Sequence, residues 1–199
     1  MFKRVAYLLR YWMFLMAIFL LEKPLFMLYA NSERGAYNLR DFIEVILHSV
    51  PLDMSCAGCF LILPLLVTVI SVYWKKMPVQ GVLRFYNLLL ALTLALAFAS
   101  DCALYPFWGF KLDSSVFFYL KSPEEAMASV SLLFLLIAVV LILFLTILIY
   151  KILNKAYVPF EFAKRPLVAT ILHLLIAAPL LLSIRGGIKE STMNVGKVY

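Results

Sequence analysis

The run MASVSLLFLLIAVVLILFLTILIY, residues 127–150, contains no Asp, Glu, Lys, Arg or His. An α-helix rises about 1.5 Å per residue, and about 20 predominantly apolar residues cross the hydrocarbon core of a bilayer. The run is longer than this minimum and is apolar throughout. It therefore predicts a transmembrane helix.

The rest of the chain has the same character. Its 199 residues are 65% hydrophobic and 15% charged, with a mean hydropathy of +0.98. A soluble domain is about 45–50% apolar and about 25% charged, so the core of a soluble domain of this size cannot hold this composition. The formal net charge is +7, but Lys and Arg lie at the ends of apolar runs. That pattern indicates membrane anchoring and not nucleic-acid binding.

Charged connectors divide the chain into five predicted spans. Residues 2–10 carry three bases, an apolar segment follows from Tyr11, and no small-residue cleavage site comes after it, which favours an uncleaved signal anchor. Between the first two spans, Asp41 can cap a short amphipathic helix that we expect to lie in the outer interface. A helix N-terminus is predicted before the fourth span by the capping box of Ser122 and Glu125, with Pro123 at the first helical position. The spans cover approximately residues 8–29, 50–74, 85–107, 127–150 and 167–184.

Lys and Arg are unevenly distributed among the connectors. One set is roughly twice as dense in these bases as the other, and denser connectors are cytoplasmic. The denser set is residues 1–10, 75–84 and 151–165. The other set is residues 31–50, 107–126 and 185–199. The expected fold is therefore an all-α integral membrane protein with five transmembrane helices, its N-terminus inside and its C-terminus outside.

Several ionisable residues fall inside or beside the outer halves of the predicted spans. They are Glu22, Lys23, Asp53, Asp101 and Arg185. Ionisable groups in hydrocarbon cost several kcal/mol unless they are paired or wetted, so they are candidates for function. Lys23 and Arg185 would bind a lipid phosphate, while the acids would orient these bases or accept a hydroxylated head group. Alternatively, Lys23 and the acids pair with one another and lock the bundle.

Other groups in the sequence favour structural roles. Cys56 and Cys59 form a C-x-x-C pair, but it lies in an apolar run, which favours small-residue packing over redox or metal chemistry. His173 is alone in the inner half of the fifth span, which favours a hydrogen-bonded structural histidine over a proton relay. The sequence contains no nucleophile with an adjacent base, no P-loop and no hydrolytic metal pattern. We therefore expect no catalytic residue, cofactor or metal site within residues 1–199.

Several stretches resemble a known family. Residues 101–113, DCALYPFWGFKLD, and residues 118–131, FYLKSPEEAMASVS, resemble a segment of the lipoteichoic acid synthase-like proteins. These are membrane enzymes of the sulfatase and alkaline phosphatase superfamily in Gram-negative bacteria. Residues 51–55, PLDMS, resemble the start of the family's second span. Residues 184–187, IRGG, with Asn194 and Tyr199, resemble its exit from the fifth span. The WGFKLD run is the most specific of these matches.

The resemblance implies a two-part enzyme of the bacterial cytoplasmic (inner) membrane. A five-helix membrane domain, residues 1–184, and an extracytoplasmic linker, residues 185–199, would precede a catalytic domain that these 199 residues do not contain. That domain would carry a Thr nucleophile and a divalent metal (Mn or Mg), and would transfer phosphoglycerol or phosphoethanolamine from a membrane phospholipid. The present chain would anchor the enzyme and present its lipid substrate, and we expect it to be a truncated piece of the longer protein. A stand-alone structural anchor and a small transporter are the alternatives.

Overall fold

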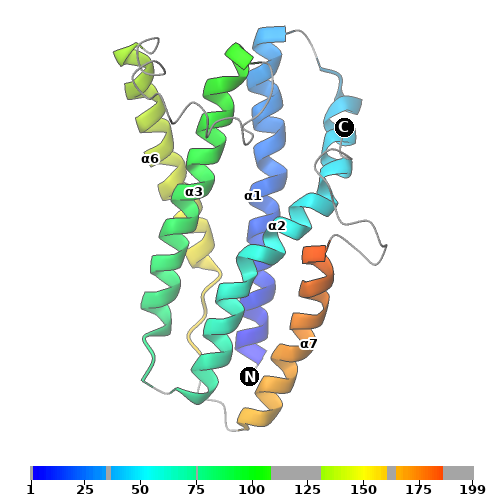
Figure 1. Cartoon of the computed structure of the whole chain (residues 1–199), viewed down its shortest axis with the longest axis vertical. Coiled ribbons are helices and arrows are strands. Elements are labelled where there is room, and N and C mark those ends of the chain that lie inside the picture. Colours follow the sequence, from blue (N-terminus) through cyan, green and yellow to red (C-terminus); the bar gives the residue numbers. More distant parts are fainter. Residues whose placement is uncertain (1, 35–36, 75, 109–130, 161–164, 186–199) are drawn as a thin grey trace.

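The computed structural model describes residues 2–34, 37–74, 76–108, 131–160 and 165–185. These residues are almost entirely α-helical, and no strand occurs among them. The helices are α1 (Phe2–Arg34), α2 (Leu39–Tyr73), α3 (Val79–Trp108), α6 (Leu132–Lys155) and α7 (Pro166–Arg185). Figure 1 shows the start of α1, the turn between α2 and α3, and the start of α7 at one end of the bundle. The predicted all-α fold is confirmed.

We call this end the basic end, because residues 2–10, 76–84, 151–160 and 165 belong to it. These described stretches contain eight Lys and Arg and no Asp or Glu. The density of bases was the reason to predict that this end is cytoplasmic.

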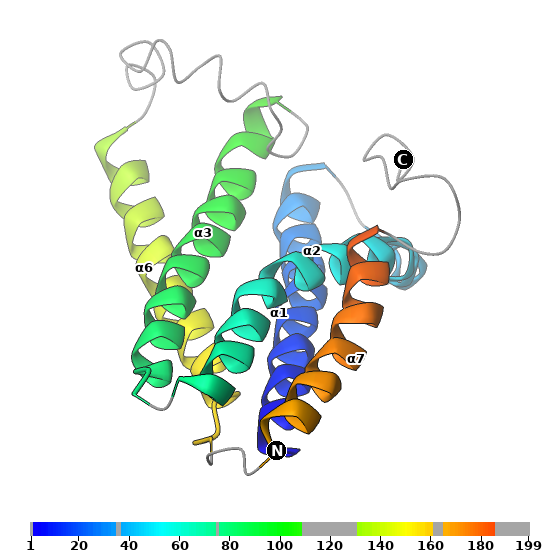
Figure 2. The ribbon, with the colours of Figure 1, turned by 60° about the horizontal axis from the view of Figure 1, so that its bottom comes forward.

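Helix α1 lies at the centre of the packing. α2 packs against both α1 and α7, while α3 packs along α6 (Figure 2). Tyr7, Tyr11 and Leu15 of α1 are fully buried, and their spacing of four residues places them on one face of the helix. The other helices bury apolar residues in the same core, among them Leu61, Leu65, Leu90, Ala91, Leu153 and Leu180. α1 therefore joins the α3–α6 pair to the α2–α7 pair.

The outside of the bundle is apolar. Leu132 of α6 is 73% exposed and Leu175 of α7 is 67% exposed. A soluble protein rarely leaves a large contiguous apolar surface in water, whereas lipid solvates it. Four helices (α1, α2, α3 and α6) are long and apolar enough to cross a membrane, and α7 contributes a shorter apolar stretch, Pro166–Leu180. These features fit a multi-pass membrane protein.

The start of α2 differs from the expected separate interfacial helix. The segment around Asp41 is the first part of α2, which continues to Tyr73. Asp41 is also not the cap: α2 begins after Asn38, whose backbone N–H donates to the Asp41 carboxylate at 2.8 Å. Figure 1 shows α2 changing direction after its first turns. Pro51 lies inside the helix, and a proline bends a helix because it lacks the N–H that the carbonyl four residues earlier would accept.

Helix α6 begins at Leu132, inside the apolar run of residues 127–150. The structure caps α6 with Ser131, whose hydroxyl oxygen accepts a hydrogen bond from the Phe134 N–H at 3.2 Å. The predicted start at Ser122–Glu125, and most of the WGFKLD run, lie outside the described residues.

Candidate functional site

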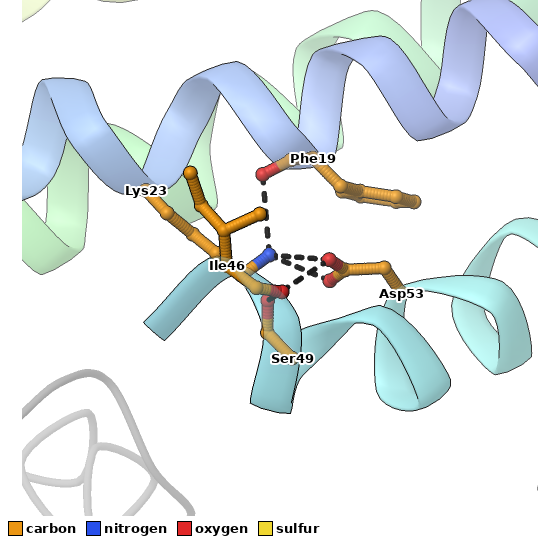
Figure 3. A network of polar contacts seen from close by, with 5 residues as sticks. All are labelled: Phe19, Lys23, Ile46, Ser49 and Asp53. Carbon is orange, nitrogen blue, oxygen red and sulfur yellow. Dashed lines mark hydrogen bonds and ion pairs between the residues drawn. The ribbon is translucent and has the colours of Figure 1, made fainter. Parts of the chain in front are cut away.

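An ion pair between Lys23 of α1 and Asp53 of α2 lies inside the bundle (Figure 3). The Lys23 ammonium donates to both Asp53 carboxylate oxygens, each at 2.7 Å. It also donates to the backbone carbonyl of Phe19 at 3.2 Å, one turn earlier on α1. The two side chains are only 16% and 8% exposed. The structure therefore brings together two of the predicted site residues, in the pairing that the sequence offered as the structural alternative.

Asp53 also has a second partner on its own helix. The Ser49 hydroxyl lies 3.3 Å from one Asp53 oxygen and 2.9 Å from the Ile46 carbonyl oxygen. Ser49 and Asp53 are four residues apart, so they lie one above the other on the same face of α2. We call Lys23, Asp53, Ser49 and Phe19 the Lys23 cluster.

The Lys23 cluster is neutral and well satisfied. An ammonium group has three hydrogens to donate, and the structure supplies three acceptor atoms from Asp53 and Phe19. Buried ions need such partners, because removing one leaves an uncompensated charge. A lipid phosphate would therefore reach Lys23 only by sharing its ammonium with Asp53. A head-group hydroxyl could instead donate to a remaining lone pair of the carboxylate.

The end of α7 reaches the same part of α2. The Ser55 hydroxyl, two residues beyond Asp53, donates to the Ile184 carbonyl at 2.9 Å. Gly58 follows at the next turn, where its bare backbone lets Ile184 and Leu180 approach closely. Arg185 is the last residue of α7, but its side chain lies outside the described residues. Its predicted contact with a lipid phosphate stays a prediction.

The remaining two acidic candidates are partly buried. Glu22 precedes Lys23 on α1, and Asp101 lies near the end of α3. At this end of the bundle α1 and α3 also touch through Phe26 and Tyr105, whose rings are 5.0 Å apart in an edge-to-face arrangement. Both acids therefore belong to the same end of the bundle as the Lys23 cluster.

Sequence reasoning missed a chain of hydrogen bonds nearer the basic end. The Tyr11 hydroxyl of α1 donates to the side-chain oxygen Oδ1 of Asn87 at 2.9 Å, and the side-chain amide of Asn87 donates to Oδ1 of Asn154 at 3.1 Å. The chain links α1, α3 and α6, and Asn87 is 1% exposed. Interhelical hydrogen bonds of this kind hold membrane helices together. The signal was an amide in the first turns of a long apolar run.

Arg4 also differs from its expected place on a solvated cytoplasmic segment. It is 3% exposed, and its guanidinium donates to the hydroxyl and to the backbone carbonyl of Ser71 at 3.3 and 3.4 Å. Arg4 and Asn87 are therefore buried polar groups near the basic end, in addition to His173 of the fifth predicted span.

His173 and the two cysteines have the following surroundings. His173 is 2% exposed, and its Nδ1 lies 2.6 Å from the Ala169 carbonyl oxygen, so the hydrogen-bonded histidine is observed. Its Nε2 is buried without a hydrogen-bond partner among the described residues. Cys56 and Cys59 are free thiols on the exposed side of α2.

The Lys23 cluster and buried Arg4 are about one membrane apart. Arg4 and Lys23 both lie on α1, and the helical rise between them corresponds to about 28 Å. The hydrocarbon core of a bilayer is about 30 Å thick. If Arg4 lies at one head-group level, the Lys23 cluster therefore lies near the other.

Comparisons with protein families, with curated proteins and with solved structures find no match for this chain.

Proposed function

We propose that the chain is the membrane domain of an extracytoplasmic phospholipid head-group transferase in a bacterial inner membrane. Five spans, with the N-terminus inside, anchor the enzyme. The Lys23 cluster presents a phospholipid head group in the outer leaflet to a catalytic domain that follows Tyr199. That domain supplies the metal and the nucleophile, and it transfers phosphoglycerol or phosphoethanolamine.

The observation that carries this proposal is the depth and chemistry of the Lys23 cluster. Its ammonium, carboxylate and hydroxyl lie about one hydrocarbon thickness from Arg4. With Arg4 at the inner head-group level, the cluster would lie at the level of the phosphates and glycerols of the outer leaflet. Burial of charge at this cost is typical of functional groups in membrane proteins. The resemblance of residues 101–131 to the lipoteichoic acid synthase-like proteins supplies the reaction class.

One observation favours a structural anchor as the second candidate. The Lys23 ammonium already has protein acceptors for its three hydrogens. An ion pair whose hydrogen bonds are all made within the protein is sufficient to fix α1 against α2, and it needs no lipid ligand. The small transporter has no comparable support.

The first test is to read the gene beyond the codon of Tyr199. The proposal expects a further domain with a Thr nucleophile and an Asp/His metal set. A stop codon at that point would overturn the proposal of a two-part enzyme and would favour the structural anchor.

The second test separates presentation of lipid from locking of the bundle. The double variant Lys23→Met/Asp53→Leu replaces the ion pair by apolar groups, so the fold can remain stable. In cells that express the whole protein, we expect the double variant to lower head-group transfer at least about tenfold. This is the loss expected when one hydrogen bond to a charged group is removed. The matched control is Arg40→Gln, which removes an exposed charge near the same end of α2. If a stable double variant transferred head groups at the unchanged rate, the Lys23 cluster would have only the structural role of holding α1 against α2.

A further inference from the structure

The basic end contains a pocket that the proposed function does not use. Its volume is about 510 Å³, within the range of sites that bind small molecules and head groups. The walls come from the start of α1, the end of α2, the turn into α3, and the segment after α6. They combine polar groups (Arg4, Ser71 and Gln80) with aromatic rings (Trp74, Tyr157 and Phe160).

The guanidinium of Arg4 is held in a fixed orientation in this wall. The Ser71 hydroxyl gives its hydrogen to the Thr68 carbonyl at 2.7 Å, so its oxygen is oriented to accept from the Nε of Arg4. The carbon of the guanidinium lies 5.3 Å from the centroid of the Phe160 ring, a cation–π arrangement. Arginine fixed by neighbours in this way is suited to the planar recognition of phosphate oxygens.

A second positive element lies in the same pocket. α3 begins at Val79, and Val79, Gln80 and Gly81 line the wall. The first-turn amides of a helix point outward and carry the positive end of the helix dipole, which favours anions. The described parts of the surrounding connectors add to the field, because they hold eight Lys and Arg and no Asp or Glu. The basic end is thus net positive whatever the partners of any single base.

The position of Trp74 identifies the level of the pocket. Trp74 is 60% exposed and closes α2, and exposed tryptophans at the ends of membrane helices sit at the head-group level. We propose that this pocket binds the phosphate ester of an anionic phospholipid in the leaflet at the basic end, with Arg4 and the start of α3 as its phosphate-binding groups. The pocket lies at the opposite end of the bundle from the Lys23 cluster, and this proposal does not rest on the proposed function.

Trp74 also provides a local reporter for the test. A Trp12→Phe/Trp108→Phe background leaves Trp74 as the only tryptophan of the chain. The purified chain in neutral detergent is titrated with dioctanoyl-phosphatidylglycerol, and Trp74 emission is followed. We expect a saturable change, and a much weaker response to dioctanoyl-phosphatidylcholine. Competition by glycerol 3-phosphate would assign the pocket to free phosphate esters as well, and absence of competition would assign it to lipid.

The key variant is Gly81→Glu. A side chain at Gly81 has room, since the nearest heavy atom to an added Cβ is the Pro78 Cβ at 4.0 Å, and an acid in the first turn of α3 suits the helix dipole. The variant should therefore fold and yet weaken phosphatidylglycerol binding at least about tenfold, because a carboxylate would then lie beside the lipid phosphate. Arg4→Met should weaken binding to a similar extent.

Two control variants test the alternative of a diffuse basic surface. Gly81→Gln fills the same space as Gly81→Glu without the charge, and Lys76→Gln removes an exposed base near the pocket. Both should bind within about twofold of the parent, because exposed charges are screened. If Gly81→Glu binds like the parent, or if Lys76→Gln weakens binding as much as Arg4→Met, the pocket is not the site. An unsaturable titration would also overturn the proposal.

Discussion

The Lys23–Asp53 ion pair illustrates how a buried charge can be both stabilising and replaceable. Each single substitution leaves its partner charged in a poorly hydrated place. We expect Lys23→Met or Asp53→Leu to lower the free energy of unfolding in detergent by about 3–5 kcal/mol, as broken buried pairs do. The double variant should recover most of that loss, because no charge is left behind. Thermal or denaturant unfolding of the four proteins measures the coupling between the two positions.

A matched pair on the surface provides the reference. Arg40 and Glu44 of α2 are also an ion pair at 2.7 Å, but their side chains are 86% and 51% exposed. Breaking this pair should cost under about 1 kcal/mol. If breaking either pair lowered the free energy of unfolding by a similar amount, water would have to hydrate the charges of Lys23 and Asp53 inside the bundle.

Individual residues show what sequence reasoning could predict at this scale. Lys23 and Asp53 stood out because charges in apolar runs are costly, and their pairing was one of two stated alternatives. The burial of Arg4 was missed because a base before an apolar run is normally exposed to cytoplasmic water. Its burial depends on Ser71, 67 residues later on α2, and no local pattern encodes such a partner. Asn87 was missed for the same reason, since its partners are on α1 and α6.

The contact between α2 and α7 depends on a residue without a side chain. A Cβ at Gly58 would lie 3.0 Å from the Ile184 side chain and 3.6 Å from Leu180. Gly58→Ala gains about 1 kcal/mol of helix propensity, which offsets this crowding, so its stability should change little. Gly58→Leu should lower the free energy of unfolding by about 1–3 kcal/mol, as overpacking does.

Truncating the opposing side chain tests the explanation. Ile184→Ala creates space at the Gly58 position, so it should restore part of the stability that Gly58→Leu loses. Losses that simply add would show that Gly58→Leu acts elsewhere, because only residues in contact couple.

At the level of helices, the apolar runs of the sequence predicted which helices are present better than they predicted where each helix begins and ends. The second span and the interfacial segment before it read as two elements because Pro51 and the polar turn at Asp41 look like a break. The backbone instead absorbs Pro51 as a bend inside α2. The energetic reason is that a membrane helix must satisfy its own hydrogen bonds, and a bent helix loses only those next to the proline.

For the whole molecule, the side on which the C-terminus emerges depends on whether α7 crosses the membrane. α1, α2, α3 and α6 are long enough, whereas the apolar stretch of α7 is shorter. Contact with Ser55 and Gly58 holds the end of α7 close to Asp53, so we expect α7 to cross. A C-terminal alkaline phosphatase fusion should then be active and a C-terminal green fluorescent protein fusion dark, while fusions after Lys76 should show the reverse. A fluorescent C-terminal fusion would mean that α7 returns to the basic side, because each crossing helix reverses the side on which the chain emerges.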